Sequence, residues 1–364
     1  MPNAPFWQVI PFHFWSVALF CFGSIVGSFL NVCIHRMPRG ESVVSPPSHC
    51  PHCNYSIPWY LNIPLATWLM LGGKCRNCGA PISVRYLLVE LLTGALFLSC
   101  WLVFGAQSPA LALVYCLLLA GFIAATFIDI EHFIIPDEIT LGGIVAGFVC
   151  SFFVHALHAA PTTATSLERC FAGVIVGAGV IYGIVRLGKM LFGRQKFELV
   201  PDSTVFFTET TMMLPDREIP YEEIFYRKSD TIVLQAKTVE MVDRCYALVP
   251  VRLSPALLRV GDDTFKPDDV QHLEVVTNEL VVPREAMGLG DVKFMAAIGA
   301  FLGWQAVVFT LMLSSIVGAT YGLSMIALKK QEWSGRLYYG PFIALAATLW
   351  IFGGGRIMHW WLGP

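Results

Sequence analysis

The sequence predicts an all-α polytopic membrane protein of about eight transmembrane helices, interrupted by two polar domains. Hydrophobic residues make up 55% of its 364 residues, charged residues only 14%, and the mean hydropathy is +0.62. Soluble domains are much less apolar and more highly charged than this. Several apolar runs approach the length of about 20 residues that a helix needs to cross the hydrocarbon core of a bilayer.

The apolar runs divide the chain into five parts. We count seven or eight such runs, at 14–34, 86–104, 109–128, 138–157, 171–188, 292–303 with 305–328 as a broken pair, and 340–361. The first span therefore lies in 1–34 and the first polar domain in 35–85. Spans two to five lie in 86–188, the second polar domain in 189–287, and the last three spans in 288–364.

The charges around the first span predict its orientation. No basic residue precedes this run, and Arg36 and Arg39 follow it, so we expect a retained helix and not a cleaved signal peptide. Basic loops stay on the cytoplasmic side of a membrane. This rule places Met1 outside and both polar domains, 35–85 and 189–287, in the cytoplasm.

The first polar domain contains two C-x2-C pairs, "CPHC" and "CRNC", with 21 residues between them. Each pair can bind one side of a tetrahedral ion, and the spacing is slightly longer than the roughly 15–20 residues typical of zinc sites. Two disulfides are the alternative, but a reducing cytoplasm disfavours them. We therefore predict a structural Zn²⁺ site formed by Cys50, Cys53, Cys75 and Cys78. His49 and His52 are expected to be solvated neighbours of this site.

The second polar domain is predicted to be a β-rich soluble insert. It holds more than half of the charged residues of the chain, and segments such as "STVFFTET", "DTIVLQAKTVEMV" and "YALVPVRL" are short runs rich in β-branched residues. A short helix is expected in 253–263 and another strand in 266–276. The insert contains no phosphate loop, nucleophile elbow or ligand cluster, so we expect it to be accessory.

Two acidic residues lie at the ends of predicted membrane helices, and both ends are cytoplasmic. Asp129 ends the third apolar run, and Asp291 precedes the sixth within "GLGDVK". Two carboxylates that lie close together do not both ionise easily, so one keeps a proton, as in aspartic proteases. Alternatively, Asp291 caps its helix and Asp129 anchors the membrane interface. Asp137, which follows Pro136, is the main rival to Asp129.

Six motifs, in order, resemble those of the type IV prepilin peptidases, which are bacterial membrane aspartic peptidases of the G-x-G-D type. They are "GSFLNVCIHRMP" (27–38), the paired "CPHC" and "CRNC", "RYLLVELLTGALF" (85–97), "DIEHFIIPDEIT" (129–140), "GLGDVKFMAAIGAFLGW" (288–304) and "YGPFIALAA" (339–347). The resemblance covers nearly the whole chain outside 189–287. The long insert is the departure from the family pattern.

The resemblance implies a function and a set of site residues. Asp129 and Asp291 would be the catalytic pair of a multi-pass enzyme of the bacterial inner membrane. Its partners would be membrane lipid and its substrates, the precursors of type IV pilins or type II secretion pseudopilins, and no nucleic acid is expected. A second activity would methylate the new N-terminus with S-adenosylmethionine.

Two other classes of protein also place carboxylates in membrane helices. In an ion-coupled transporter the aspartates would be ion ligands, but the internal repeat expected of many transporters is not visible. A zinc-stabilised membrane scaffold would assemble partners without any chemistry. Cleavage of a pilin precursor is the observation that separates the peptidase from both.

Overall fold

The structure is a computed structural model that describes residues 10–221, 224–225, 230–270, 272–283, 288–328, 337–354 and 356. It contains two compact units, Met1–Tyr182 with Leu289–Pro364, and Gly183–Gly288. We call these the membrane unit and the β unit and describe each by itself. Met1 and the end of the predicted run 340–361 beyond residue 354, apart from Arg356, lie outside the described residues.

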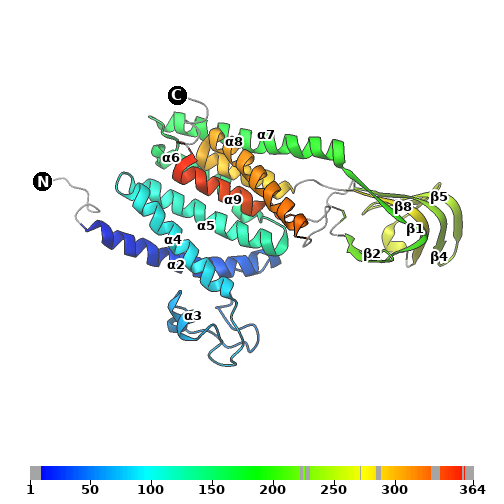
Figure 1. Ribbon diagram of the computed structural model, residues 1–364, viewed down its shortest axis with the longest axis horizontal. Coiled ribbons are helices and arrows are strands. Elements are labelled where there is room, and N and C mark those ends of the chain that lie inside the picture. The colour runs from blue at the N-terminus through cyan, green and yellow to red at the C-terminus, as the bar shows by residue number, and fades with distance from the viewer. Residues whose placement is uncertain are drawn as a thin grey trace. The chain divides into compact units, whose positions relative to one another are not determined.

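The membrane unit is a bundle of apolar helices (Figure 1). They are α2 (Phe12–Arg36), α4 (Val84–Cys100), α5 (Pro109–His132), α6 (Asp137–Phe153), α7 (Thr163–Phe192), α8 (Leu289–Ala327) and α9 (Gly340–Leu349). A π-helical turn, η3 (Trp101–Gly105), extends α4, and the last turns of α7 belong to the β unit. Among the described residues, five helices are long and apolar enough to cross a membrane. A polytopic membrane protein is thus confirmed, whereas the count of eight spans stays a prediction.

A break at Gly303 divides α8. Its backbone angles are φ 78° and ψ 174°, which lie outside the helical region and which L-residues other than glycine rarely adopt. The expected pair of runs, 292–303 and 305–328, is therefore one helical element with a kink at the junction.

Small residues let α7 approach α8 closely. A Cβ atom at Gly173 would lie 2.0 Å from the carbonyl oxygen of Gly299, and one at Gly177 would lie 2.4 Å from that of Met295. Bringing two backbones this close is a common way to pack helices in a membrane, because lipid offers no hydrophobic driving force between helices.

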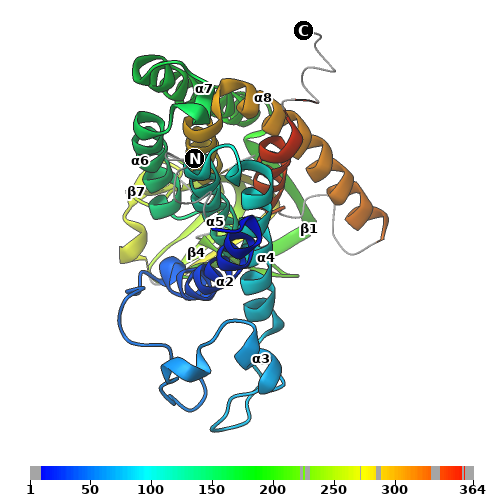
Figure 2. The ribbon, with the colours of Figure 1, turned by 90° about the vertical axis from the view of Figure 1, so that its left-hand side faces the viewer.

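The segment that connects α2 to α4 lies beside one end of these two helices, as Figures 1 and 2 show. It contains little regular structure: the short helix α3 (Ala66–Met70) and two 3-10 turns, Met37–Arg39 and Trp59–Leu61. Two isolated β-bridges, His49 with Ser56 and Lys74 with Pro81, close its two cysteine hairpins.

The described residues of the β unit contain one antiparallel sheet of eight strands, which confirms a β-rich insert. The strands are β1 (Arg194–Phe207), β2 (Thr211–Met213), β3 (Glu218–Pro220), β4 (Ile232–Met241), β5 (Cys245–Leu253), β6 (Leu258–Val260), β7 (Asp263–Phe265) and β8 (Leu273–Pro283). Their order in the sheet is β3-β2-β1-β8-β4-β5-β6-β7. Alternate residues of β4 and β8 are buried, as expected for a sheet with one face on a core.

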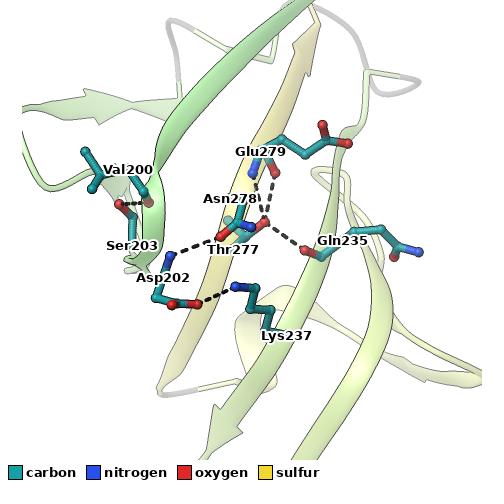
Figure 3. A network of polar contacts seen from close by, with 8 residues as sticks. All are labelled: Val200, Asp202, Ser203, Gln235, Lys237, Thr277, Asn278 and Glu279. Carbon is teal, nitrogen blue, oxygen red and sulfur yellow. Dashed lines mark hydrogen bonds and ion pairs between the residues drawn. The ribbon is translucent and has the colours of Figure 1, made fainter.

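Polar side chains replace ladder hydrogen bonds where the strand register shifts (Figure 3). The pairing of β4 with β8 is irregular around Ala236, and there the buried Thr277 hydroxyl lies 2.7 Å from the carbonyl oxygen of Gln235. At the bulge of β1, Asp202 adopts a φ of 62° and its N–H donates to Asn278 Oδ1 at 3.0 Å. A bulge leaves backbone groups out of the ladder, and side-chain partners such as these can satisfy them.

The prediction of a short helix in 253–263 is wrong. This stretch contributes to a hairpin, in which β6 pairs with β7 across a turn that contains Gly261 at φ 61°. Leu258 and Val260 are both buried, so their side chains alternate with the exposed Arg259 at the strand period of two.

Because the first and last strands of the β unit are paired, we predict that most of this unit can be deleted without unfolding the membrane unit. Arg194 of β1 lies opposite Pro283 of β8 in an antiparallel ladder, so the chain enters and leaves the sheet at adjacent positions. Replacing residues 197–280 with a short Gly/Ser linker should leave the membrane unit folded, because a shorter loop costs less closure entropy. Membrane insertion and the unfolding temperature in detergent would measure this, and an unfolded membrane unit would contradict it.

Candidate active site and metal centre

The two C-x2-C pairs form equivalent hairpins. The N–H of Cys50 donates to the carbonyl oxygen of Tyr55, and the N–H of Cys75 donates to that of Ala80, at 3.0 and 2.8 Å. The residue after the second cysteine is left-handed in each hairpin, with φ 53° at Asn54 and 72° at Gly79. Asn and Gly tolerate this conformation best, so the sequence favours this turn twice.

The hairpins bring all four predicted cysteines together. Their Sγ atoms lie within 4.8 Å of one another. Cys50 Sγ is 3.8 Å from Cys78 Sγ, and Cys53 Sγ is 4.0 Å from Cys75 Sγ. Sulfur ligands about 2.3 Å from a tetrahedral zinc ion would be about 3.8 Å apart. The donor set and its spacing therefore fit a metal ion, without the predicted neighbours His49 and His52.

Hydrogen bonds favour the thiolate form of two of these cysteines. The amide of Asn77, 3.6 Å from Cys53 Sγ, lowers the pKa of that thiol to about 6, together with a backbone hydrogen bond at Tyr55. Backbone N–H groups of Cys78 and Asn77 lower the pKa of Cys75. Metals bind the thiolate and not the thiol, so these contacts favour metal binding by Cys53 and Cys75, whereas the pKa of Cys78 is raised to about 11.

Asp129 lies one turn before the end of α5 and is 5% exposed. Its Oδ2 accepts a hydrogen bond of 2.8 Å from the N–H of Gly340, the first residue of α9. The N–H groups of a first helical turn have no partner within the helix, so a carboxylate is a natural acceptor there. One of the two predicted catalytic residues is thus held at the N-terminus of another helix.

Gly340 leaves room for the Asp129 carboxylate. A Cβ atom at position 340 would lie 2.8 Å from Asp129 Oδ2 and 3.2 Å from Ile135 Cδ1. The preceding Tyr339 fixes this turn, because its hydroxyl lies 2.9 Å from Ser314 Oγ and 3.0 Å from Ser315 Oγ of α8.

Asp291 is the third residue of α8 and is half-buried. A Cβ atom on the preceding Gly290 would lie 3.5 Å from Ile135, the residue that also contacts Gly340. Further along the same two helices, Phe122 of α5 packs edge-on against Phe294 of α8, with ring centroids 5.6 Å apart. The segments that carry Asp129 and Asp291 therefore meet around Ile135.

Asp137, the rival of Asp129, lies in a different environment. It is the first residue of α6, its side chain is 58% exposed, and its Oδ1 is 2.6 Å from Lys293 Nζ. This ion pair joins the start of α6 to α8 two residues after Asp291. Residue spacing alone did not predict the pair, since its members are far apart in the chain.

The contact between Gly340 and Asp129 was also missed from the sequence. The "YGPFIALAA" motif contains a signal that could have found it. A proline just inside a helix start, here Pro341, marks the position where free N–H groups point out of the helix.

Acidic residues at the ends of membrane helices and a four-cysteine cluster identify a polytopic membrane protein with a candidate acid–base site and a candidate metal site. Residues 21–104 match the bacterial peptidase A24 N-terminal domain, and residues 116–197 and 249–323 match the type IV leader peptidase family. The chain belongs to this family of membrane peptidases. The interruption of the match between 197 and 249 falls within the β unit.

Relatives agree with this assignment. The prepilin leader peptidase/N-methyltransferase of Aeromonas hydrophila is 28% identical over 97% of this chain and 95% of its own length. The protein of the same name from Dichelobacter nodosus is 36% identical over 48% of this chain and 67% of its own length. That of Myxococcus xanthus is 43% identical over 49% of this chain and 57% of its own length. No solved structure matches the chain.

The cysteine cluster predicts a measurable metal content. Purified protein should contain about one zinc ion per chain, and Cys53→Ser should lower that content and the unfolding temperature. Cys245→Ser, at an exposed cysteine of the β unit, is the matched control and should change neither. Elemental analysis measures the content, and a reduced preparation without zinc would refute the site.

The tight fit at Gly340 predicts a loss of peptidase activity on adding one methyl group. Gly340→Ala should slow leader cleavage about 100-fold, because Asp129 is predicted to be catalytic and displacing a catalytic group by about 1 Å has effects of that size. Gly121→Ala of α5 is the control, since no atom lies within 4 Å of its Cβ position. Steady-state cleavage of a pilin precursor would measure both, and wild-type rates in Gly340→Ala would show that this contact is dispensable.

Proposed function

We propose that this chain cleaves the leader peptide of type IV prepilins or type II secretion pseudopilins, with Asp129 and Asp291 as its catalytic pair. It would then methylate the new N-terminus with S-adenosylmethionine. The observation that carries the catalytic assignment is the meeting of the two aspartate segments around Ile135. The names of the relatives support the substrate class and the second activity.

The two carboxylates divide the work of peptide hydrolysis. One takes a proton from the attacking water, and the other donates a proton to the carbonyl oxygen of the scissile bond. Collapse of the tetrahedral intermediate transfers a proton to the leaving amine. The Gly340 N–H positions the Asp129 carboxylate during these steps.

The location of the chemistry follows from the substrate and the topology. A prepilin leader ends just before a hydrophobic helix, so in a membrane-embedded precursor the scissile bond lies at the cytoplasmic interface. We place eight spans in the bacterial inner membrane, with the N-terminus outside and the cysteine cluster and β unit in the cytoplasm. Both aspartates then lie at the interface that holds the scissile bond.

The metal in this proposal is a structural Zn²⁺ ion. Cys50, Cys53, Cys75 and Cys78 would fill all four positions of a tetrahedral site, so no position would remain for water or substrate. Its role would be to hold together the segment between α2 and α4, which contains little regular structure.

The β unit is accessory in this proposal. Strands β2, β3 and β4 lie where the family match is interrupted, and the ends of the unit are adjacent in the sheet. Family membership also argues against a scaffold without chemistry. An ion-coupled transporter has no supporting feature among the described residues beyond the carboxylates themselves.

Substitution of each aspartate tests the catalytic assignment. Asp129→Asn and Asp291→Asn should each slow precursor cleavage at least about 100-fold, because neither amide can exchange the required proton. Asp137→Asn should retain cleavage, since its carboxylate is exposed and paired with Lys293. Asp216→Asn at the surface of the β unit is the matched control.

Mass spectrometry of the mature N-terminus would measure cleavage and methylation in one assay, with membrane insertion checked in parallel. Substantial cleavage by Asp129→Asn, with none by Asp137→Asn, would transfer the catalytic role to Asp137. Cleavage by Asp291→Asn would refute the assignment of Asp129 and Asp291 as the catalytic pair.

A further inference from the structure

A cavity of ≈ 540 Å³ lies between the ends of α2 and α4 and the cysteine-containing segment. Small-molecule sites typically have volumes of about 300–1,000 Å³. Aromatic side chains, including Tyr55, Trp68 and Tyr86, line it together with buried polar groups. Neither the peptidase mechanism nor the metal cluster uses this cavity, although Cys50 and Cys75 lie on its wall.

One of the buried polar groups has an unused acceptor. Asn31 lines the cavity and is 1% exposed. Its Nδ2 donates to the carbonyl oxygens of Gly27 and Tyr86, at 3.3 and 3.1 Å. Its Oδ1 has no hydrogen-bond partner among the described residues. A buried acceptor without a partner costs about 1–3 kcal/mol, so a ligand that donates a hydrogen bond would recover this energy.

The second group is a buried carboxylate that has no ion-pair partner in the part of the chain that the structure describes. Glu90 of α4 lines the cavity and is 7% exposed. Its Oε2 accepts the N–H of Leu65 at 2.7 Å, and it forms no ion pair among the described residues. Leu65 adopts a φ of 61°, a strained conformation for this residue type. Buried charges are normally paired, so this carboxylate is suited to a positively charged ligand.

One ion pair links the cavity wall to α5. Arg85 precedes Tyr86 of the cavity wall and forms an ion pair with Glu131. Glu131 follows Asp129 by two residues on α5. The ion pair therefore joins the segment at the cavity wall to the last turns of α5, the helix that carries Asp129.

We propose that this cavity binds S-adenosylmethionine, with the Glu90 carboxylate facing its positive charge and Asn31 Oδ1 accepting a hydrogen bond from it. The inference rests on the proposed methyltransferase activity. The aromatic lining suits an adenine ring, which stacks on such side chains. When bound, the donor supplies a methyl group: the new amine forms its N–C bond as the S–CH₃ bond breaks, sulfur keeps that electron pair, and the ammonium releases a proton to water.

Direct binding to the purified, zinc-loaded full chain tests the location. Thr67 lines the cavity, whereas Leu69 on the same helix, α3, is 63% exposed and does not. Titration calorimetry with S-adenosylmethionine should show binding to the wild type and to Leu69→Trp, and none to Thr67→Trp. Unfolding temperature and zinc content check that the variants are folded. Wild-type affinity in a folded Thr67→Trp would overturn the location.

A second pair of variants tests the charge. Glu90→Gln keeps an acceptor for the Leu65 N–H but loses the charge, and should weaken S-adenosylmethionine binding about tenfold or more. The affinity for 5′-methylthioadenosine, which carries neither the sulfonium nor the amino-acid group, should stay unchanged. Glu168→Gln, at an exposed position, is the control and should change neither affinity. An equal loss for both ligands in Glu90→Gln would refute the role of the charge.

The same preparation separates the two proposals. A wild-type chain that cleaves a prepilin but does not bind S-adenosylmethionine refutes this inference alone. A chain that binds S-adenosylmethionine at this cavity but does not cleave supports the inference and overturns the proposed peptidase function.

Discussion

The hydrogen bond from the Gly340 N–H to the Asp129 carboxylate joins positions 211 residues apart, and the proposed active site depends on it. It requires a glycine at 340, because a Cβ atom there would displace the carboxylate. It also requires the turn before α9 to stay in place, which the contacts of Tyr339 with two serines of α8 provide. A buried carboxylate held by a fixed donor has little freedom to reorient, and such preorganisation is what acid–base chemistry needs.

Backbone approach recurs wherever the membrane unit is tight. Gly173 and Gly299 let α7 approach α8, and Gly27 lets α2 approach α4. In each case the small residue replaces a side chain with another segment of backbone, which is how helices gain contact area in lipid.

Features that depend on residues close together in the sequence could be predicted, and contacts between residues far apart in the sequence could not. Each C-x2-C pair specifies its own hairpin, so the four-cysteine cluster was predicted from spacing alone. The Asp129–Gly340 contact, the Asp137–Lys293 pair and the cavity at Glu90 depend on how distant helices pack, which residue types do not encode locally. The hairpin at 258–265 was mistaken because three-residue strands are too short to show their period clearly.

The division of the chain into two units explains how such a departure from the family pattern is compatible with the same chemistry. The β unit has its own core of alternating buried side chains, and its first and last strands are paired. The chain leaves this sheet beside the point where it entered. The insertion therefore requires only that the ends of α7 and α8 be joined by two adjacent strands. Asp129, Gly340, Asp291 and the cysteine cluster all lie in the other unit. Selection on the β unit can therefore change what it contacts without moving the residues proposed to carry out the reaction.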